Sequence, residues 1–168
     1  MAHPRHARVR QRYHYRCGYC GVSEADTGGE LTVDHYRPRA ADGDESAINL
    51  VYACIKCNQF KGNFFPNADD LQHGRRVLHP MQDDFSVHLC ENAQTGHLEP
   101  LTETGRFFIT LLQLNRPALV EHRLRRWLAA LLAEKQRILE AENAQLRAII
   151  AAQERYVAHL RQLLGFPG

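Results

Sequence analysis

The chain of 168 residues has no apolar run approaching the roughly 18 residues that a membrane-spanning helix needs. Its N-terminus, M-A-H-P-R-H-A-R-V-R, also lacks the apolar stretch of a secretory signal. These absences argue against a membrane protein and predict a cytoplasmic location. With 44% hydrophobic and 24% charged residues, the composition is typical of a globular rather than a disordered chain.

Residues 1–16 contain no acidic side chain. The five arginines of this basic N-terminal arm are Arg5, Arg8, Arg10, Arg12 and Arg16. A segment with charge of one sign suits a partner with a phosphate backbone. A solubilising terminus without a partner is an equally good interpretation.

Residues 118–164 contain neither glycine nor proline, and strong helix formers dominate there. Apolar residues recur at spacings of three, four and seven, which predicts a long amphipathic helix over residues 118–168. A turn near Asn143 would make it a helical hairpin. The helix suits a homodimer or a protein partner, or it packs back on Phe107, Phe108 and Trp127. Three polar residues interrupt a clean heptad and argue against a long parallel coiled coil: Lys135, Glu142 and Gln153.

Four of the five cysteines form two Cys-x-x-Cys pairs, Cys17/Cys20 and Cys54/Cys57. Zinc binds four thiolates in a tetrahedron, and a two-residue spacer lets both sulfurs of a pair face one ion. The sequence therefore predicts a structural zinc site, with free or redox-active thiols as the alternative. Because 33 residues separate the pairs, more than in an ordinary zinc ribbon, we expect an inserted functional element. The remaining Cys90 is predicted to be a small buried apolar residue.

The residues between and after the cysteine pairs predict two strands and a helix. Leu31–Val33 is a short β-like run that leads into Asp34-His35, and residues 49–53 form a second run. A helix of about two turns is expected from Asn58 to Phe64. The following segment, 67–117, predicts strands at 86–90 and 97–101. Thr104 is predicted to cap a further helix, and Pro117 to lie in the first turn of the last one.

The order of these motifs closely resembles the HNH endonuclease family in its zinc-stabilised form. Asp34-His35, Asn49-Leu50 and C-N-Q-F-K carry the resemblance over residues 16–61, and the phrases R-P-R, N-L-V-Y-A-C and C-N-Q-F-K-G-N match stand-alone bacterial members. A looser likeness extends to about residue 123.

The resemblance implies an α+β fold with a small ββα-metal (His-Me finger) nuclease core and a zinc clamp of four cysteines. The core would occupy residues 17–66, with an α+β extension at 67–117 packing on it. The basic arm precedes the core, and the long C-terminal helix or hairpin of 118–168 follows the extension.

The resemblance also implies a metal-dependent reaction on DNA. His35 would act as the general base that activates a water molecule, since a neutral imidazole accepts a proton near neutral pH. Asp34 and Asn58 would hold a catalytic Mg²⁺ or Mn²⁺, because carboxylate and amide oxygens suit hard cations. Asn49 would fix the loop and orient His35.

Three basic residues are candidates for contacts with the substrate phosphate: Arg37, Arg39 and Lys61. The sequence departs from some family members at Gly62, where they place a further histidine. The metal would then have only two side-chain ligands.

Two other functions fit parts of the sequence. A non-catalytic zinc-ribbon module that binds nucleic acid explains the cysteines and the basic arm. It does not explain why Asp34, His35, Asn49 and Asn58 all stand at family positions. The resemblance also allows an effector nuclease of a defence system that a partner protein activates.

Overall fold

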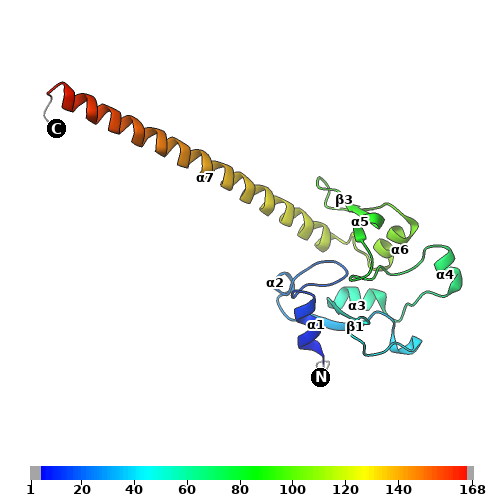
Figure 1. Ribbon diagram of the computed structural model, residues 1–168. Helices are drawn as coiled ribbons and strands as arrows, with labels where there is room; N and C mark the ends of the chain where they lie inside the picture. Colours follow the sequence, from blue (N-terminus) through cyan, green and yellow to red (C-terminus); the bar gives the residue numbers. More distant parts are fainter. Residues whose placement is uncertain (1–4, 166–168) are drawn as a thin grey trace. The chain divides into compact units, whose positions relative to one another are not determined.

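A computed structural model describes residues 5–165 (Figure 1). The predicted basic arm therefore lies partly outside the described residues. Contacts within the chain divide it into two units, one ending at Leu124 and the other beginning at Arg125.

The centre of the first unit is an antiparallel hairpin of β1 (Thr32–His35) and β2 (Leu50–Ala53), which confirms the two predicted strands. Asp34 lies opposite Val51 in the register. All four residues of β2 are buried, whereas β1 buries only Asp34. Because β1 is covered less completely, its end can present polar side chains to solvent.

Helix α3 (Ile55–Lys61) follows β2 and contacts β1. The prediction that this helix starts at Asn58 was wrong. The sulfur of Cys54 accepts the backbone N–H of Cys57, so the second Cys-x-x-Cys pair itself forms the first turn. The helix ends at Gly62, which adopts a positive φ of 52°.

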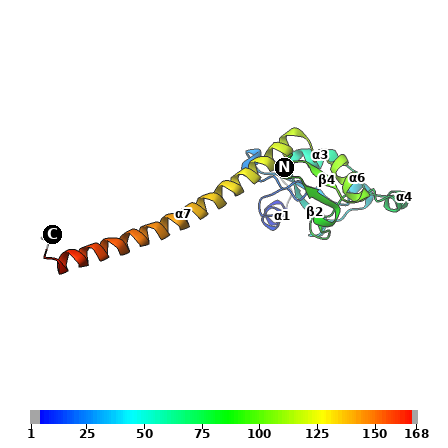
Figure 2. The same ribbon diagram turned by 90° about the horizontal axis from the view of Figure 1, so that it is seen from above.

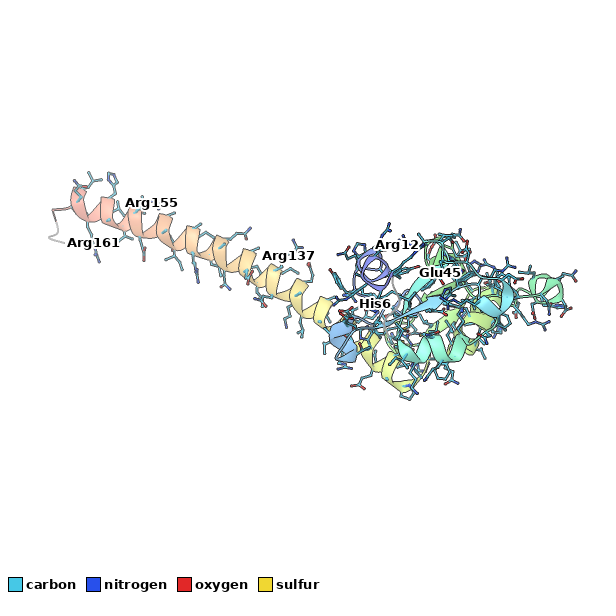
Figure 3. All side chains as sticks on the ribbon, turned by 90° about the horizontal axis from the view of Figure 1, so that it is seen from below. His6, Arg12, Glu45, Arg137, Arg155 and Arg161 are labelled. Atoms are coloured by element: carbon cyan, nitrogen blue, oxygen red, sulfur yellow. The ribbon has the colours of Figure 1, made fainter. Side chains whose placement is uncertain are left out.

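Helix α1 (His6–Arg12) packs on the hairpin, and α2 (Glu24–Thr27) follows the first cysteine pair. Glu24 joins them, since it accepts hydrogen bonds from Arg10 at 2.5 and 2.6 Å and from the Tyr52 hydroxyl at 2.5 Å. Arg12, which Figure 3 labels, donates to the backbone oxygen of Ala47 in the loop between the strands. The described part of the arm is thus attached to the body of the unit.

The segment from 67 to 117 contains a second antiparallel hairpin and three short helices. These elements are α4 (Ala68–Gln72), α5 (Phe85–His88), β3 (Leu89–Glu91), β4 (Leu98–Pro100) and α6 (Glu103–Leu111), and α6 packs against β4 (Figure 2).

Three predictions in this segment were wrong in detail. The strand expected from Ser86 begins only at Leu89, because Asp84 accepts the N–H of Ser86 and starts a helical turn. Thr102 rather than Thr104 caps α6, through the N–H of Gly105. Cys90 is exposed, because it lies on the outward face of a two-stranded hairpin.

The buried core connects the first hairpin to this segment. Phe108 of α6 is fully buried and lies edge-on to Tyr19 at a centroid distance of 6.5 Å and to Phe85 at 5.3 Å. Leu50, Leu78 and Leu112 are also fully buried. Unit one therefore has a single core, to which the two halves of its sequence both contribute.

The last element, α7, is one helix of 47 residues, Pro117–Leu163 (Figures 1 and 2). This confirms the predicted long helix and the first-turn position of Pro117. Asn143 lies within the helix, so the hairpin alternative is excluded. None of the described helices, α7 included, is both long and apolar enough to cross a membrane.

A glycine in the loop that leads from β1 to β2 tolerates no side chain. A Cβ at Gly43 would lie 1.8 Å from the backbone oxygen of Arg37. We expect Gly43→Ala to lower the free energy of unfolding by about 1–3 kcal/mol, because the backbone must move to relieve the clash. Urea denaturation measures the change. Gly29→Ala, which meets no atom within 4 Å, is the matched control and should stay close to wild type.

Candidate active site and zinc centre

The four predicted cysteine ligands gather in space. Within the described residues, the Sγ atoms of Cys17, Cys20, Cys54 and Cys57 all lie within 4.8 Å of one another. Cys20 Sγ and Cys54 Sγ are 3.8 Å apart. This distance matches the edge of a tetrahedron with zinc–sulfur bonds of about 2.3 Å, and it is far longer than a disulfide bond. The cluster fits a structural zinc ion with four protein ligands.

An arginine that the sequence did not single out lies beside this cluster. Arg116 directs its guanidinium to Cys54 Sγ at 3.8 Å and to Cys57 Sγ at 3.9 Å. Four thiolates around one Zn²⁺ carry a net negative charge, which a neighbouring cation offsets. No local signal predicts this contact, because Arg116 follows α6 and is distant in sequence from both cysteines.

The zinc cluster is connected directly to the central hairpin. The backbone N–H of Gly18, within the first cysteine pair, donates to the backbone oxygen of Tyr52 at 2.8 Å. The second pair continues from β2 into α3. Binding of one ion to all four sulfurs therefore holds the first turn, the hairpin and α3 in one arrangement.

Next to this arrangement is a pocket of about 300 Å³ at the end of β1. It brings together three predicted catalytic or metal-binding residues, Asp34, His35 and Asn58, and Arg39 also lines it. Asp34 and His35 come from the end of β1, and Asn58 comes from α3. The fourth predicted residue, Asn49, does not line this pocket.

Asp34 is buried and already has two partners. The Tyr19 hydroxyl donates to Asp34 Oδ2 at 2.6 Å, and Lys61 Nζ lies 3.1 Å from the carboxylate. Burial raises the pKa of the Asp34 carboxyl and lowers the pKa of the Lys61 ammonium, while their attraction opposes both shifts. A carboxylate has about four acceptor positions, so these contacts leave room for a metal ion.

The position of Lys61 differs from the one expected of a phosphate contact. Its side chain is 0% exposed, and Nζ also donates to the backbone oxygen of His35 at 2.7 Å. Lys61 lies one helical turn after Asn58, which places it on the inner face of α3 rather than at the surface. The structure therefore corrects its predicted contact with substrate phosphate: Lys61 joins Asp34 to the end of β1.

His35 is paired with Glu45, an acidic residue that the sequence did not single out. Its Nε2 lies 2.8 Å from Glu45 Oε1. The same carboxylate oxygen accepts a bond of 2.5 Å from Arg39. The Glu45 side chain is 41% exposed, so this contact is accessible to solvent.

Asn49 closes the loop that carries Glu45. Its Oδ1 accepts the N–H of Arg37 at 2.7 Å, and its Nδ2 donates to the backbone oxygens of Arg37 at 3.1 Å and Asp44 at 2.7 Å. Both the oxygen and the nitrogen of the Asn49 side-chain amide therefore form hydrogen bonds, and together these bonds join the two sides of the loop.

Asn58 donates its amide nitrogen to Thr32 Oγ1 at 3.2 Å. Among the described residues, no side chain or backbone group donates a hydrogen bond to the side-chain oxygen of Asn58, Oδ1. The oxygens of Asp34 and Asn58 in one pocket form a donor set that suits Mg²⁺ or Mn²⁺.

Comparison with known proteins agrees with this geometry. Residues 17–64 match the family model of the HNH endonuclease. This part of the chain is an HNH endonuclease domain. Over 54 residues the chain is 43% identical to the CRISPR-associated endonuclease Cas9 of Corynebacterium diphtheriae. That match covers 32% of this chain and 5% of the relative's length, and no solved structure matches.

The matched region lies within the first unit. It ends before the second hairpin and α7. The match therefore covers the pocket and both cysteine pairs, but it gives no information on α7.

The zinc site leads to a prediction that uses Cys90 as its control. We expect one zinc per chain in the wild type and in Cys90→Ser, because Cys90 lies outside the cluster. Cys57→Ser should lose the ion. Since structural zinc contributes about 10–16 kcal/mol in small zinc domains, the cooperative thermal transition of the first unit should also disappear. Elemental analysis and calorimetry measure the two effects, and full zinc content in Cys57→Ser would contradict the assignment.

Proposed function

We propose that this protein is a metal-dependent endonuclease that hydrolyses DNA phosphodiester bonds. The observation that supports it best is the pocket that joins Asp34, His35 and Asn58 within an HNH domain. A zinc-binding module without activity would not need these three polar groups to converge beside the clamp.

In the proposed reaction, His35 is the general base. Its imidazole accepts a proton from the attacking water, which then adds to the phosphorus atom. Glu45, at 2.8 Å from Nε2, orients the ring and stabilises the imidazolium that forms. Asn49 is a positioning residue that acts through the loop: its three hydrogen bonds hold the segment in which Glu45 lies.

Asp34 and Asn58 are the proposed ligands of the divalent ion. When bound, Mg²⁺ or Mn²⁺ stabilises the negative charge that develops on the scissile phosphate and on the leaving 3′ oxygen. Tyr19 and Lys61 hold the Asp34 carboxylate in place through hydrogen bonds. The Lys61 ammonium also reduces the cost of keeping that carboxylate charged in a buried position.

Arg39 is the best placed candidate for a phosphate contact. It lines the pocket and is largely exposed, and Glu45 is its ion-pair partner. Arg37 is held farther from the pocket, over the ring of Phe65 at 5.2 Å and on the backbone oxygen of Ala41. We therefore propose Arg39 as the main phosphate-binding side chain, with Arg37 as a secondary one.

One observation favours a second candidate, a nuclease that stays inactive until a partner or the substrate rearranges the loop. Glu45 engages both the proposed base and the proposed phosphate-binding arginine. A negative charge at this position repels an incoming phosphate. Activation would then require Glu45 to release Arg39.

Plasmid cleavage tests the proposed function. Purified protein should nick or cut DNA with added Mg²⁺ or Mn²⁺ and not with EDTA. His35→Ala should reduce the rate by about 10²–10⁴-fold, the usual contribution of a general base. His73→Ala is the matched control, because His73 is exposed beside α4 and pairs with Asp69 of that helix. Cleavage by His35→Ala at nearly the wild-type rate would eliminate the assigned base.

The role of Glu45 is tested separately with Glu45→Gln. If Glu45 orients His35, we expect kcat to fall about tenfold with KM nearly unchanged, as for other groups that support a functional side chain. Glu140→Gln, on the exposed surface of α7, is the control. A higher rate for Glu45→Gln would instead support the inactive state in which Glu45 restrains Arg39.

A further inference from the structure

The second unit consists of the exposed part of α7, and Arg137, Arg155 and Arg161 project from it (Figure 3). Within the described residues of this unit, the large apolar side chains are all at least 37% exposed. They are Trp127, Leu128, Leu131, Leu132, Ile138, Leu139, Leu146, Ile149, Ile150, Tyr156, Val157, Leu160, Leu163 and Leu164. This number of exposed apolar groups on one helix indicates a surface that another surface covers.

These residues form a single stripe, which we call the apolar stripe. Successive residues of a helix are rotated by about 100° around its axis. Viewed down the axis, all of these side chains therefore fall within an arc of about 140°. A repeat of eleven residues relates Leu128, Leu139 and Ile150. Because eleven residues complete nearly three whole turns, the stripe runs almost straight along α7 and does not wind around it.

Two opposite charges lie within the apolar stripe. Lys135 and Glu142 are seven residues apart, and both project from the side of α7 that carries the leucines and isoleucines. In a parallel, in-register pair of helices, each would face the same residue of the other chain. Like charges would then meet at two positions.

We propose that a second copy of this chain covers the apolar stripe from residue 125 to residue 152, with the two helices antiparallel and Lys135 of each opposite Glu142 of the other. The two-fold axis then passes between Ile138 and Leu139. In this register Leu128 lies opposite Ile149, and both charged pairs form at once because the contact is symmetric.

Within this overlap the stripe fits the same register, while its five residues from Tyr156 to Leu164 lie beyond it. Leu131 lies opposite Leu146, and Ile138 lies opposite Leu139. The overlap runs from residue 125 to residue 152, about 42 Å at 1.5 Å per residue. That is about four heptads, which is enough for a stable helical pair.

The charged pair selects this register over a shift by eleven residues. The shifted pair covers more of the apolar stripe, because it also pairs Leu128 with Leu160 and Leu131 with Val157, but it places Glu142 opposite Leu146 and Lys135 opposite Gln153. A charge buried against a leucine loses its hydration without a partner. A polar pair within an apolar seam therefore determines register and orientation more than it adds stability.

Charge reversal in the full-length, zinc-loaded protein tests the proposal by sedimentation equilibrium. The wild type should be a dimer at micromolar concentration. Lys135→Glu or Glu142→Lys alone should weaken the dimer at least about tenfold, because each change creates two like-charge pairs. The double variant Lys135→Glu/Glu142→Lys should restore it. Glu140→Lys, on the opposite side of α7, is the control and should leave the dimer unchanged.

Disulfide trapping in a Cys90→Ser background tests the orientation. Leu128→Cys and Ile149→Cys chains should cross-link when mixed, and neither should cross-link alone. A cross-link within Leu128→Cys alone would show parallel helices and overturn the proposal. A monomeric wild type, or a double charge variant that stays monomeric, would overturn it as well. Neither experiment depends on nuclease activity.

Discussion

The convergence of four cysteine sulfurs, in a cluster that fits one zinc ion, is the constraint on which the rest of the first unit depends. The hairpin and α3 bury too little apolar surface to be stable on their own, since a small element pair gains little from burial. The cluster joins the turn at Cys17, the end of β2 and the start of α3. Arg116 adds a link to the segment after α6, because its guanidinium lies against two of the sulfurs. Loss of the ion would therefore separate elements that position the pocket.

The proposed active site uses the same short helix as the zinc clamp. Within seven residues, α3 supplies a zinc ligand in Cys57, a proposed metal ligand in Asn58 and the buried partner of Asp34 in Lys61. These side chains point in different directions because successive helical residues are rotated by about 100°. Helix geometry thus fixes the positions of these three side chains relative to one another.

Sequence reasoning predicted both strands of the central hairpin, the four cysteine ligands and the long last helix, because each depends on local spacing or local propensity. It failed where a single side-chain contact decided the outcome. Ser86 was expected in a strand, but Asp84 starts a helical turn there. Lys61 was expected to contact substrate phosphate, but its buried ammonium pairs with Asp34.

The amino-acid sequence by itself determined which groups can carry chemistry: two cysteine pairs, an Asp-His step at a strand end and an asparagine directly after the last cysteine. It also determined that residues 118–164 are helical, because no residue there interrupts the hydrogen-bond ladder. Only the tertiary structure decided which of these groups meet. The contact of Glu45 with His35, the burial of Lys61 against Asp34 and the place of Arg116 beside the thiolates join residues that are distant along the chain. Such contacts follow from how the elements pack, and no local pattern encodes them.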